Sequence, residues 1–241
     1  MPLLRLDSVH KAFGAVTVAD QMSYGVNEGE ALGVIGPNGA GKTSMFNLIT
    51  GTLVPDSGRV HFSGNDITKY NSARRCRYGL ARSFQVPQPF SGMTVFENAM
   101  IAATQAAGLH GVQAERFCLE ILDQTELLPK ANTLAGSLTL LERKRLELTR
   151  ALCAKPRLLL LDEIAGGLTE AECQSLVQTI KDIHASGVTI IWIEHVVHAL
   201  LAVVDRLIVI DFGMKIAEGE PHAIMASPQV QEIYLGIAID A

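Results

Sequence analysis

Short apolar runs alternate along the chain with segments of helical periodicity, and glycine, proline, asparagine or acidic residues separate them. This alternation predicts strands that are buried on both faces and connected by helices, which is typical of an α/β fold with a mainly parallel sheet. Helices are expected over 42–49 and 169–184. The second has Thr169 and Glu172 in capping-box spacing, and Gly187 follows its end. Strands are expected over 3–6, 31–35, 158–162, 189–194, 206–210 and 215–217, with a turn, a strand and a turn over 52–65.

The pattern changes between about Pro87 and Arg150. Strand signals disappear there, and alanine, leucine, glutamate and glutamine dominate. We expect a helical subdomain over 87–150, inserted between two halves of one α/β core, 1–86 and 151–241.

Composition narrows the class of protein. The 241 residues are 48% hydrophobic, which provides a large core and excludes intrinsic disorder. The formal net charge of −5 argues against nucleic acid as the main partner. The four cysteines contain no CxxC pair, which argues against a zinc site and a disulfide framework and fits a reducing cytosol. No stretch reaches the roughly 18 apolar residues of a membrane span, so the chain is not expected to cross a membrane on its own.

A glycine-rich turn joins the expected strand 31–35 to the next helix. Its sequence, Gly36-Pro-Asn-Gly-Ala-Gly-Lys42-Thr43, fits the GxxxxGK[ST] phosphate loop in the strand-to-helix context that this motif requires. Glycines let backbone N–H groups wrap a phosphate, Lys42 reaches the β- and γ-phosphates, and the Thr43 hydroxyl ligates Mg²⁺. The predicted ATP-binding residues of this loop are Gly36, Asn38, Gly39, Ala40, Gly41, Lys42, Thr43 and Ser44.

Two carboxylates follow one another at the end of the apolar run 158–162. Successive strand residues point to opposite sides, so one carboxylate can support a metal ion while the next faces the substrate. Asp162 is therefore the candidate for Mg²⁺, and Glu163 is the candidate base that polarises the attacking water.

The phosphate loop, the acidic strand end and the later segment Ile191-Trp-Ile-Glu-His195 follow one another in an order that resembles the ATP-binding-cassette (ABC) ATPases. The resemblance covers essentially the whole chain. It implies a P-loop ATPase core with N-terminal antiparallel strands and an inserted helical subdomain, and two such units that sandwich two ATP molecules.

The resemblance also implies roles for three further residues. Phe13, in Lys11-Ala-Phe-Gly14, looks like the aromatic residue that stacks on adenine, although a core phenylalanine is an equal reading. Gln85, in Arg82-Ser-Phe-Gln85, looks like the glutamine that contacts Mg²⁺ and couples to the membrane partner. His195 looks like the histidine that contacts the γ-phosphate. The catalytic set is thus Lys42, Gln85, Glu163 and His195, and the metal set is Thr43, Gln85 and Asp162.

The family signature LSGGQ is altered in this chain. At its expected position the sequence reads Leu138-Thr-Leu-Leu-Glu142, so both glycines are leucine and the glutamine is Glu142. Leucine side chains hinder close backbone approach, and Glu142 adds negative charge where a partner's phosphate would bind. A shifted reading, Leu134-Ala-Gly-Ser137, breaks the spacing. Ile164 also replaces the usual proline after Glu163. These departures predict a heterodimer with two unequal ATP sites.

Further segments are similar to the ATP-binding subunits of bacterial importers for branched-chain and hydrophobic amino acids: Gly79–Gln85, Met93–Asn98, Arg145–Glu147 and Tyr234–Gly236. Relatives of that family also carry urea and amides. The resemblance implies a related ATPase or a second copy as partner, two transmembrane permeases, and indirectly a periplasmic binding protein. It places the chain at the cytoplasmic face of the inner membrane.

Two features are candidates for contact with the permease. Arg74, Arg75, Arg77 and Arg82 form a basic cluster, which reads either as a solvated helix face or as a contact with permease or lipid head groups. The apolar loop 86–90 beside Gln85 is the better docking candidate.

Two other functions stay open at this point. One is a soluble ABC ATPase of an assembly machine, and the other is a mainly ATP-binding, regulatory half of an asymmetric dimer. A P-loop kinase or GTPase is disfavoured, because those proteins lack the inserted lobe and the histidine at a strand end in this order.

Overall fold

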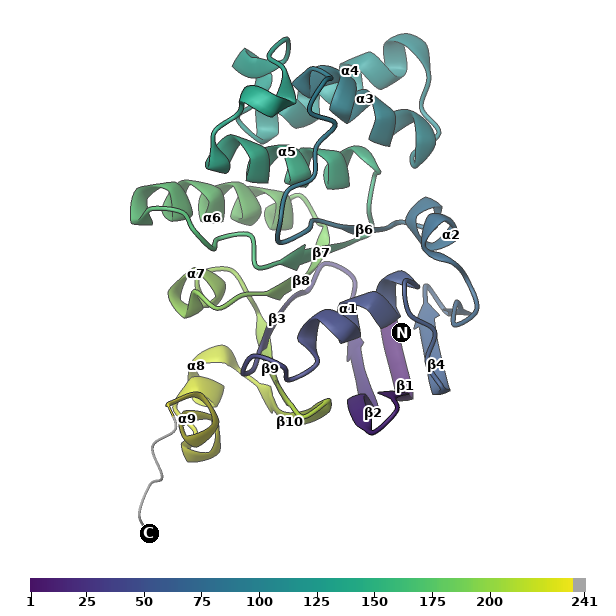
Figure 1. Cartoon of the computed structure of the whole chain (residues 1–241), viewed down its shortest axis with the longest axis vertical. Helices are drawn as coiled ribbons and strands as arrows, with labels where there is room; N and C mark the ends of the chain where they lie inside the picture. Colours follow the sequence, from purple (N-terminus) through teal and green to yellow (C-terminus); the bar gives the residue numbers. More distant parts are fainter. Residues whose placement is uncertain (236–241) are drawn as a thin grey trace.

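The computed structural model describes residues 1–235, and its strands form two sheets (Figure 1). One sheet is antiparallel and has the order β2-β1-β4-β5, with β1 (Leu4–Phe13), β2 (Val16–Val26), β4 (Ser57–Phe62) and β5 (Asn65–Asp66). The other has the order β10-β9-β3-β8-β7-β6 and is parallel except for β10. It contains β3 (Ala31–Ile35), β6 (Leu80–Arg82), β7 (Leu158–Asp162), β8 (Thr189–Ile193), β9 (Arg206–Asp211) and β10 (Met214–Gly219).

The helices cover these sheets in layers (Figure 1). Helix α1 (Lys42–Thr50) contributes its apolar side to a core shared with both sheets, and α6 (Glu170–Ala185) and α7 (Val197–Leu201) pack on the opposite face of the larger sheet. Helices α3, α4 and α5 lie together at one end of the molecule. The remaining bounds are α2 (Ser72–Arg77), α3 (Val95–Gln105), α4 (Gly111–Gln124), α5 (Leu140–Cys153), α8 (Pro221–Met225) and α9 (Pro228–Leu235).

The α/β architecture with a mainly parallel sheet and a separate group of helices agrees with the sequence prediction. Strands β3, β7 and β8 are buried at every position, as expected for a sheet that is covered on both faces. Strand β1 is longer than the expected strand 3–6, and β2 was not expected as a separate strand. Met22, Tyr24 and Val26 are buried and alternate with less buried neighbours, which is the pattern of a half-buried antiparallel strand.

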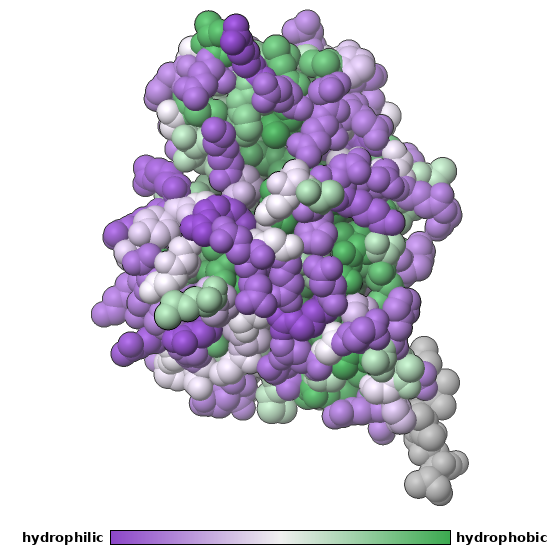
Figure 2. Space-filling view, turned by 180° about the vertical axis from the view of Figure 1, so that it is seen from behind, coloured by the Kyte–Doolittle hydropathy of each residue, from purple (hydrophilic) through white to green (hydrophobic). Residues whose placement is uncertain are grey.

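Among the described residues, none of the helices is long and apolar enough to span a bilayer. Seen from behind, the surface is mostly hydrophilic, and hydrophobic residues appear on it as separate patches (Figure 2). The backbone of α9 includes the first two residues of the motif Tyr234–Gly236, whereas Gly236 lies outside the described residues.

Three helices begin with a capping box in which a threonine hydroxyl and a glutamate three residues later satisfy each other's backbone N–H groups. The pairs are Thr94 with Glu97, Thr139 with Glu142, and Thr169 with Glu172. Only the third was predicted from the sequence. The backbone N–H of each threonine donates to the glutamate and holds the pKa of all three carboxyls below its ordinary value.

These lowered pKa values make the folding stability depend on pH. The charged boxes contribute stability above the ordinary glutamate pKa, and this contribution is lost as pH falls through that pKa towards the folded-state value. The double variant Glu97→Gln/Glu172→Gln keeps an acceptor in each box but removes its charge. We expect its melting temperature to fall less steeply than that of the wild type between about pH 6 and about pH 3.5.

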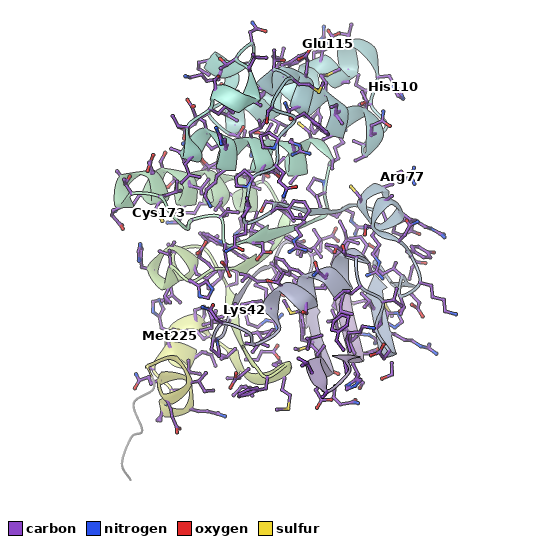
Figure 3. The ribbon with its side chains drawn as sticks, in the orientation of Figure 1. Lys42, Arg77, His110, Glu115, Cys173 and Met225 are labelled. Carbon is purple, nitrogen blue, oxygen red and sulfur yellow. The ribbon has the colours of Figure 1, made fainter. Side chains whose placement is uncertain are left out.

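The control is Glu115→Gln, because Glu115 is an exposed residue at the outer end of the helical group and belongs to no capping box (Figure 3). It should keep the wild-type pH slope. An equal slope in the double variant and the wild type would contradict the prediction.

Candidate functional site

Four neighbouring parallel strands deliver loops to one edge of the larger sheet. Strands β3, β8, β7 and β6 are adjacent in that order, and the phosphate loop, Glu194-His195, the acidic pair and the segment to Gln85 follow their carboxyl ends. In open α/β sheets this edge is where ligands bind. Parallel pairing therefore gathers residues that lie up to about 160 positions apart in the sequence.

The phosphate loop approaches neighbouring backbone too closely for side chains at two of its glycines. A Cβ on Gly36 would lie 2.0 Å from the carbonyl oxygen of Ile210, and a Cβ on Gly41 would lie 2.4 Å from that of Val18. Gly41 also has φ +101° and precedes the first residue of α1. Only glycine fits these positions, so the loop's N–H groups stay at the helix N-terminus, where an anion binds.

Lys42 lies at the start of α1, near the middle of the molecule (Figure 3). Its Nζ donates to the carbonyl oxygens of Gly36 at 2.7 Å and Pro37 at 2.9 Å, so the ammonium group folds back on its own loop. Burial lowers the pKa of Lys42, and the carboxylates of Glu163 and Asp162 oppose that shift. Phosphate oxygens can replace these carbonyl acceptors.

Asp162 is 3% exposed at the end of β7. Its Oδ2 accepts a hydrogen bond from Arg82 Nη2 at 2.5 Å, whereas its Oδ1 is buried and has no partner within the described residues. Burial raises the pKa of Asp162, and the hydrogen bond and charge of Arg82 oppose this. An unpartnered carboxylate oxygen, together with the exposed Thr43 that follows Lys42, fits the oxygen ligands that Mg²⁺ prefers.

Glu163 connects the ends of two other loops. Its Oε1 lies 2.9 Å from His195 Nε2, and its Oε2 accepts a hydrogen bond from Gln85 Nε2 at 2.5 Å. The structure thus brings three of the four predicted catalytic residues into direct contact. Glu163 also has φ +48°, a left-handed conformation that is costly for a residue with a side chain and that recurs at functional sites.

Two charged residues of this site were missed from the sequence. Glu194 is 1% exposed, and its carboxylate accepts backbone N–H groups from His195 and Ala165, each at 2.9 Å. It therefore ties the histidine loop to the loop after Glu163. Lys144 of α5 lies nearby, and burial lowers its pKa while Glu194 and Glu163 oppose the shift. The sequence offered one signal for Glu194, its place between an apolar run and His195.

Phe13, the predicted adenine contact, lies in the antiparallel sheet and not at the edge of the larger sheet. Phe13 ends β1 and is 51% exposed, with Lys11 Nζ 5.2 Å from its ring centroid. This exposure disagrees with the reading of Phe13 as a core residue. A free aromatic face next to a cation is suited to stacking on a base.

The comparisons with known proteins decide the family. Residues 19–166, more than half of the chain, match the family described as "ABC transporter". The chain belongs to the ATP-binding family of ABC transporters. Members of this family hydrolyse ATP, so the chain is an ATPase subunit, and the P-loop fold that the resemblance implied is confirmed.

Individual relatives agree over nearly the full length of this ABC ATPase. A probable branched-chain amino acid transport ATP-binding protein LivG from Methanocaldococcus jannaschii is 33% identical, with 98% of each chain covered. A lipopolysaccharide export ATP-binding protein LptB from Acidithiobacillus ferridurans is 32% identical, with 97% of each chain covered. A solved nucleotide-free ATP-binding cassette superposes with a TM-score of 0.90 at 32% identity, covering 98% of this chain and 100% of the other.

The altered signature of this ABC ATPase forms a regular helix start. Thr139 caps α5, and Glu142 accepts the Thr139 N–H at 2.9 Å and lies 3.2 Å from Lys130. The charge of Glu142 is therefore engaged in capping, which the sequence analysis did not anticipate. Leu140 is 44% exposed, and its side chain would lie 3.4 Å from a Cβ on Gly167. Two leucines thus stand where the family has glycines.

The interpretation of the arginine cluster as one surface is wrong for two of its four members. Arg75 is fully buried and donates to carbonyl oxygens, including those of Leu48 and Ile49 at the end of α1. Arg82 binds Asp162. Arg74 and Arg77 are exposed, and Arg77 lies at the outer end of α2 (Figure 3). Carbonyl groups at a helix end, and a buried carboxylate, supply the acceptors that a cation needs in the interior.

The role of Glu194 gives a prediction about stability. Replacing it by glutamine places an NH₂ group against one of the backbone N–H donors, so we expect Glu194→Gln to destabilise the chain by about 2–4 kcal/mol. Urea denaturation measures this. The control is Glu170→Gln, because the Glu170 side chain is 63% exposed and its contacts with Gln174 (3.0 Å) and His198 (3.5 Å) lie on the surface. Equal midpoints for the two variants would contradict the prediction.

Proposed function

We propose that this chain binds and hydrolyses ATP to energise a membrane importer for branched-chain or related amino acids. The observation that carries the proposal is the match of residues 214–239 to the family described as "Branched-chain amino acid ATP-binding cassette transporter". Overall identity alone does not select this function, because the LivG and LptB relatives are 33% and 32% identical. The C-terminal match favours the amino-acid importers.

The site supports a specific division of labour in hydrolysis. The phosphate loop and Lys42 hold the phosphates of ATP, and Thr43, Asp162 and Gln85 hold Mg²⁺, which neutralises charge on the phosphates when it is bound. Glu163 accepts a proton from the attacking water, and His195 contacts the γ-phosphate. The contacts of Glu163 with His195 and Gln85 hold all three side chains at one place.

A groove beside Gln85 supports docking of a permease. It has a volume of about 330 Å³ and lies between the helical group and the core, with Phe84, Phe90 and Ile101 in its wall. The neighbouring loop is fixed to α5, because Glu147 accepts the N–H of Gln88 at 2.9 Å. An apolar groove next to a residue that touches Glu163 suits a partner that reports its state to the ATP site. Such docking implies a position at the cytoplasmic face of the membrane and an indirect link to a periplasmic binding protein.

The altered signature supports a related ATPase as the dimer partner. In a dimer of two such units, α5 of this chain faces the ATP that its partner holds. Its N-terminus carries exposed Leu140 and a capping carboxylate from Glu142 instead of glycines, which is a poor environment for phosphate. We therefore expect unequal sites, with the phosphate loop of this chain completed by a partner's intact signature.

Two other functions are tested together with this one. A soluble ATPase of an assembly machine would work without a membrane protein, so co-purification with a permease separates the two classes. A mainly ATP-binding, regulatory subunit would lack turnover in every complex. The contact between Glu163 and His195 favours an active site over that second alternative.

The first measurement is ATP hydrolysis by the purified chain, alone and with Glu163→Gln. We expect the chain alone to bind ATP with little turnover, and turnover to appear when a related ATPase subunit and the permeases are added. Glu163→Gln should abolish that turnover and retain bound ATP, because a neutral amide cannot accept the proton.

The matched control is the double variant Leu140→Gly/Leu141→Gly, which restores the glycines of the signature. It should raise hydrolysis by the isolated chain if the leucines are the cause of the low rate. Clear turnover by the wild-type chain alone, unchanged in the glycine variant, would refute unequal sites.

The stacking role of Phe13 is tested by nucleotide affinity. Loss of one base–aromatic stack costs about 1–3 kcal/mol, so Phe13→Ala should weaken ATP binding by roughly 5- to 150-fold. Phe13→Trp keeps an aromatic face and should bind ATP close to normally. Fluorescence titration with a labelled nucleotide measures both, and unchanged affinity in Phe13→Ala would exclude Phe13 as the adenine contact.

A further inference from the structure

Arg82 joins three parts of the site through one guanidinium group. It ends β6, and its Nη2 donates to Asp162 Oδ2 at 2.5 Å while its Nη1 donates to Asn47 Oδ1 of α1 at 2.7 Å. The side chains of Arg82 and Asp162 are 9% and 5% exposed. The same residue stands three positions before Gln85. Arg82 thus connects the phosphate-loop helix, the acidic strand end and the strand that leads to Gln85.

The geometry constrains the carboxylate of Asp162. A guanidinium group holds its donors in a rigid fork, so anchoring one arm on Asn47 orients the other arm towards Asp162. One oxygen of Asp162 is then occupied, and the other, the buried Oδ1, is left without a partner among the described residues. That oxygen is the one available to a metal ion or its bound water.

Arg82 is buried, so it is not simply a solvated arginine on the surface. Its guanidinium carbon lies 5.4 Å from the ring centroid of Phe46 and 5.1 Å from that of Phe84, so aromatic faces flank the cation. Arg82 also lies in the wall of the groove beside Gln85. A single side chain therefore contacts both the proposed docking groove and the carboxylate at the end of β7.

We propose that Arg82 is a positioning residue that orients Asp162 for Mg²⁺ and thereby sets the affinity of the site for the metal–nucleotide complex. The proposal rests on the proposed ATP site. Arg82 donates to the carboxylate of Asp162, so its effect on the substrate passes through Asp162. Because Arg82 also forms part of the groove, a permease that moves this wall would act on the metal carboxylate directly.

The test compares nucleotide binding with and without Mg²⁺. The probe is a fluorescent, non-hydrolysable ATP analogue, titrated onto the isolated chain in EDTA and then at increasing Mg²⁺. Residues that orient a metal ligand typically change metal affinity by 10- to 100-fold. Arg82→Met should therefore raise the Mg²⁺ concentration needed for tight binding by about that factor, with nearly unchanged affinity in EDTA.

Three variants keep the test specific. Arg82→Lys retains the charge without the fork and should give an intermediate shift. Asn47→Ala leaves the contact between Arg82 and Asp162 in place and should give a smaller shift than Arg82→Met. Arg74→Met removes an exposed arginine that stacks 3.5 Å over the ring of Tyr70 and should leave Mg²⁺ dependence unchanged.

The outcomes separate the two proposals. Equal weakening of binding in EDTA and in Mg²⁺ would assign Arg82 a structural role only and overturn the inference. Wild-type Mg²⁺ dependence in Arg82→Met would also overturn it. If the wild-type chain bound the analogue neither in EDTA nor in Mg²⁺, the proposed ATP site would instead be refuted.

Discussion

The site depends on the parallel register of four adjacent strands. Because β3, β8, β7 and β6 run in the same direction, their carboxyl ends meet at one edge of the sheet. Strands β3, β7 and β8 are buried at every position, as in a parallel sheet that is covered on both faces. The parallel register turns four separate sequence motifs into one cluster. The close approach of Gly36 and Gly41 to neighbouring backbone then fixes the phosphate loop against the same framework.

Paired buried charges organise the interior around that edge. Arg82 pairs with Asp162, and Lys144 lies near Glu194. Lys42 donates hydrogen bonds to carbonyl oxygens of its own loop. Each group is costly to bury alone, and each is compensated by a partner or by backbone N–H and C=O groups. The folded chain itself therefore compensates these buried charges.

The ATP-binding loops and the start of α5 differ in how much of the family sequence pattern they keep. The phosphate loop and Glu163 retain the chemistry that ATP requires, and the contacts between Glu163, His195 and Gln85 support an active arrangement. The start of α5 has replaced its glycines while keeping a sound helix cap from Thr139 and Glu142. Helix formation at this segment needs a cap, whereas phosphate binding needs glycines. The segment has the cap, and in a dimer with unequal sites it would not have to bind phosphate.

Local rules determined much of this protein from the sequence alone. The phosphate loop is recognised by its GxxxxGK[ST] pattern after an apolar run, and the buried strands by runs of apolar residues, because both patterns are local in the sequence. The tertiary structure decided what depends on distant contacts. Arg82 meets Asp162 across 80 positions and Glu194 meets Ala165 across 29, so neither arginine nor glutamate shows in its own segment that it is buried. The spacing of the four arginines suggested one basic surface for the same reason: burial of a charge is set by the partner that compensates it, and only the folded chain supplies that partner.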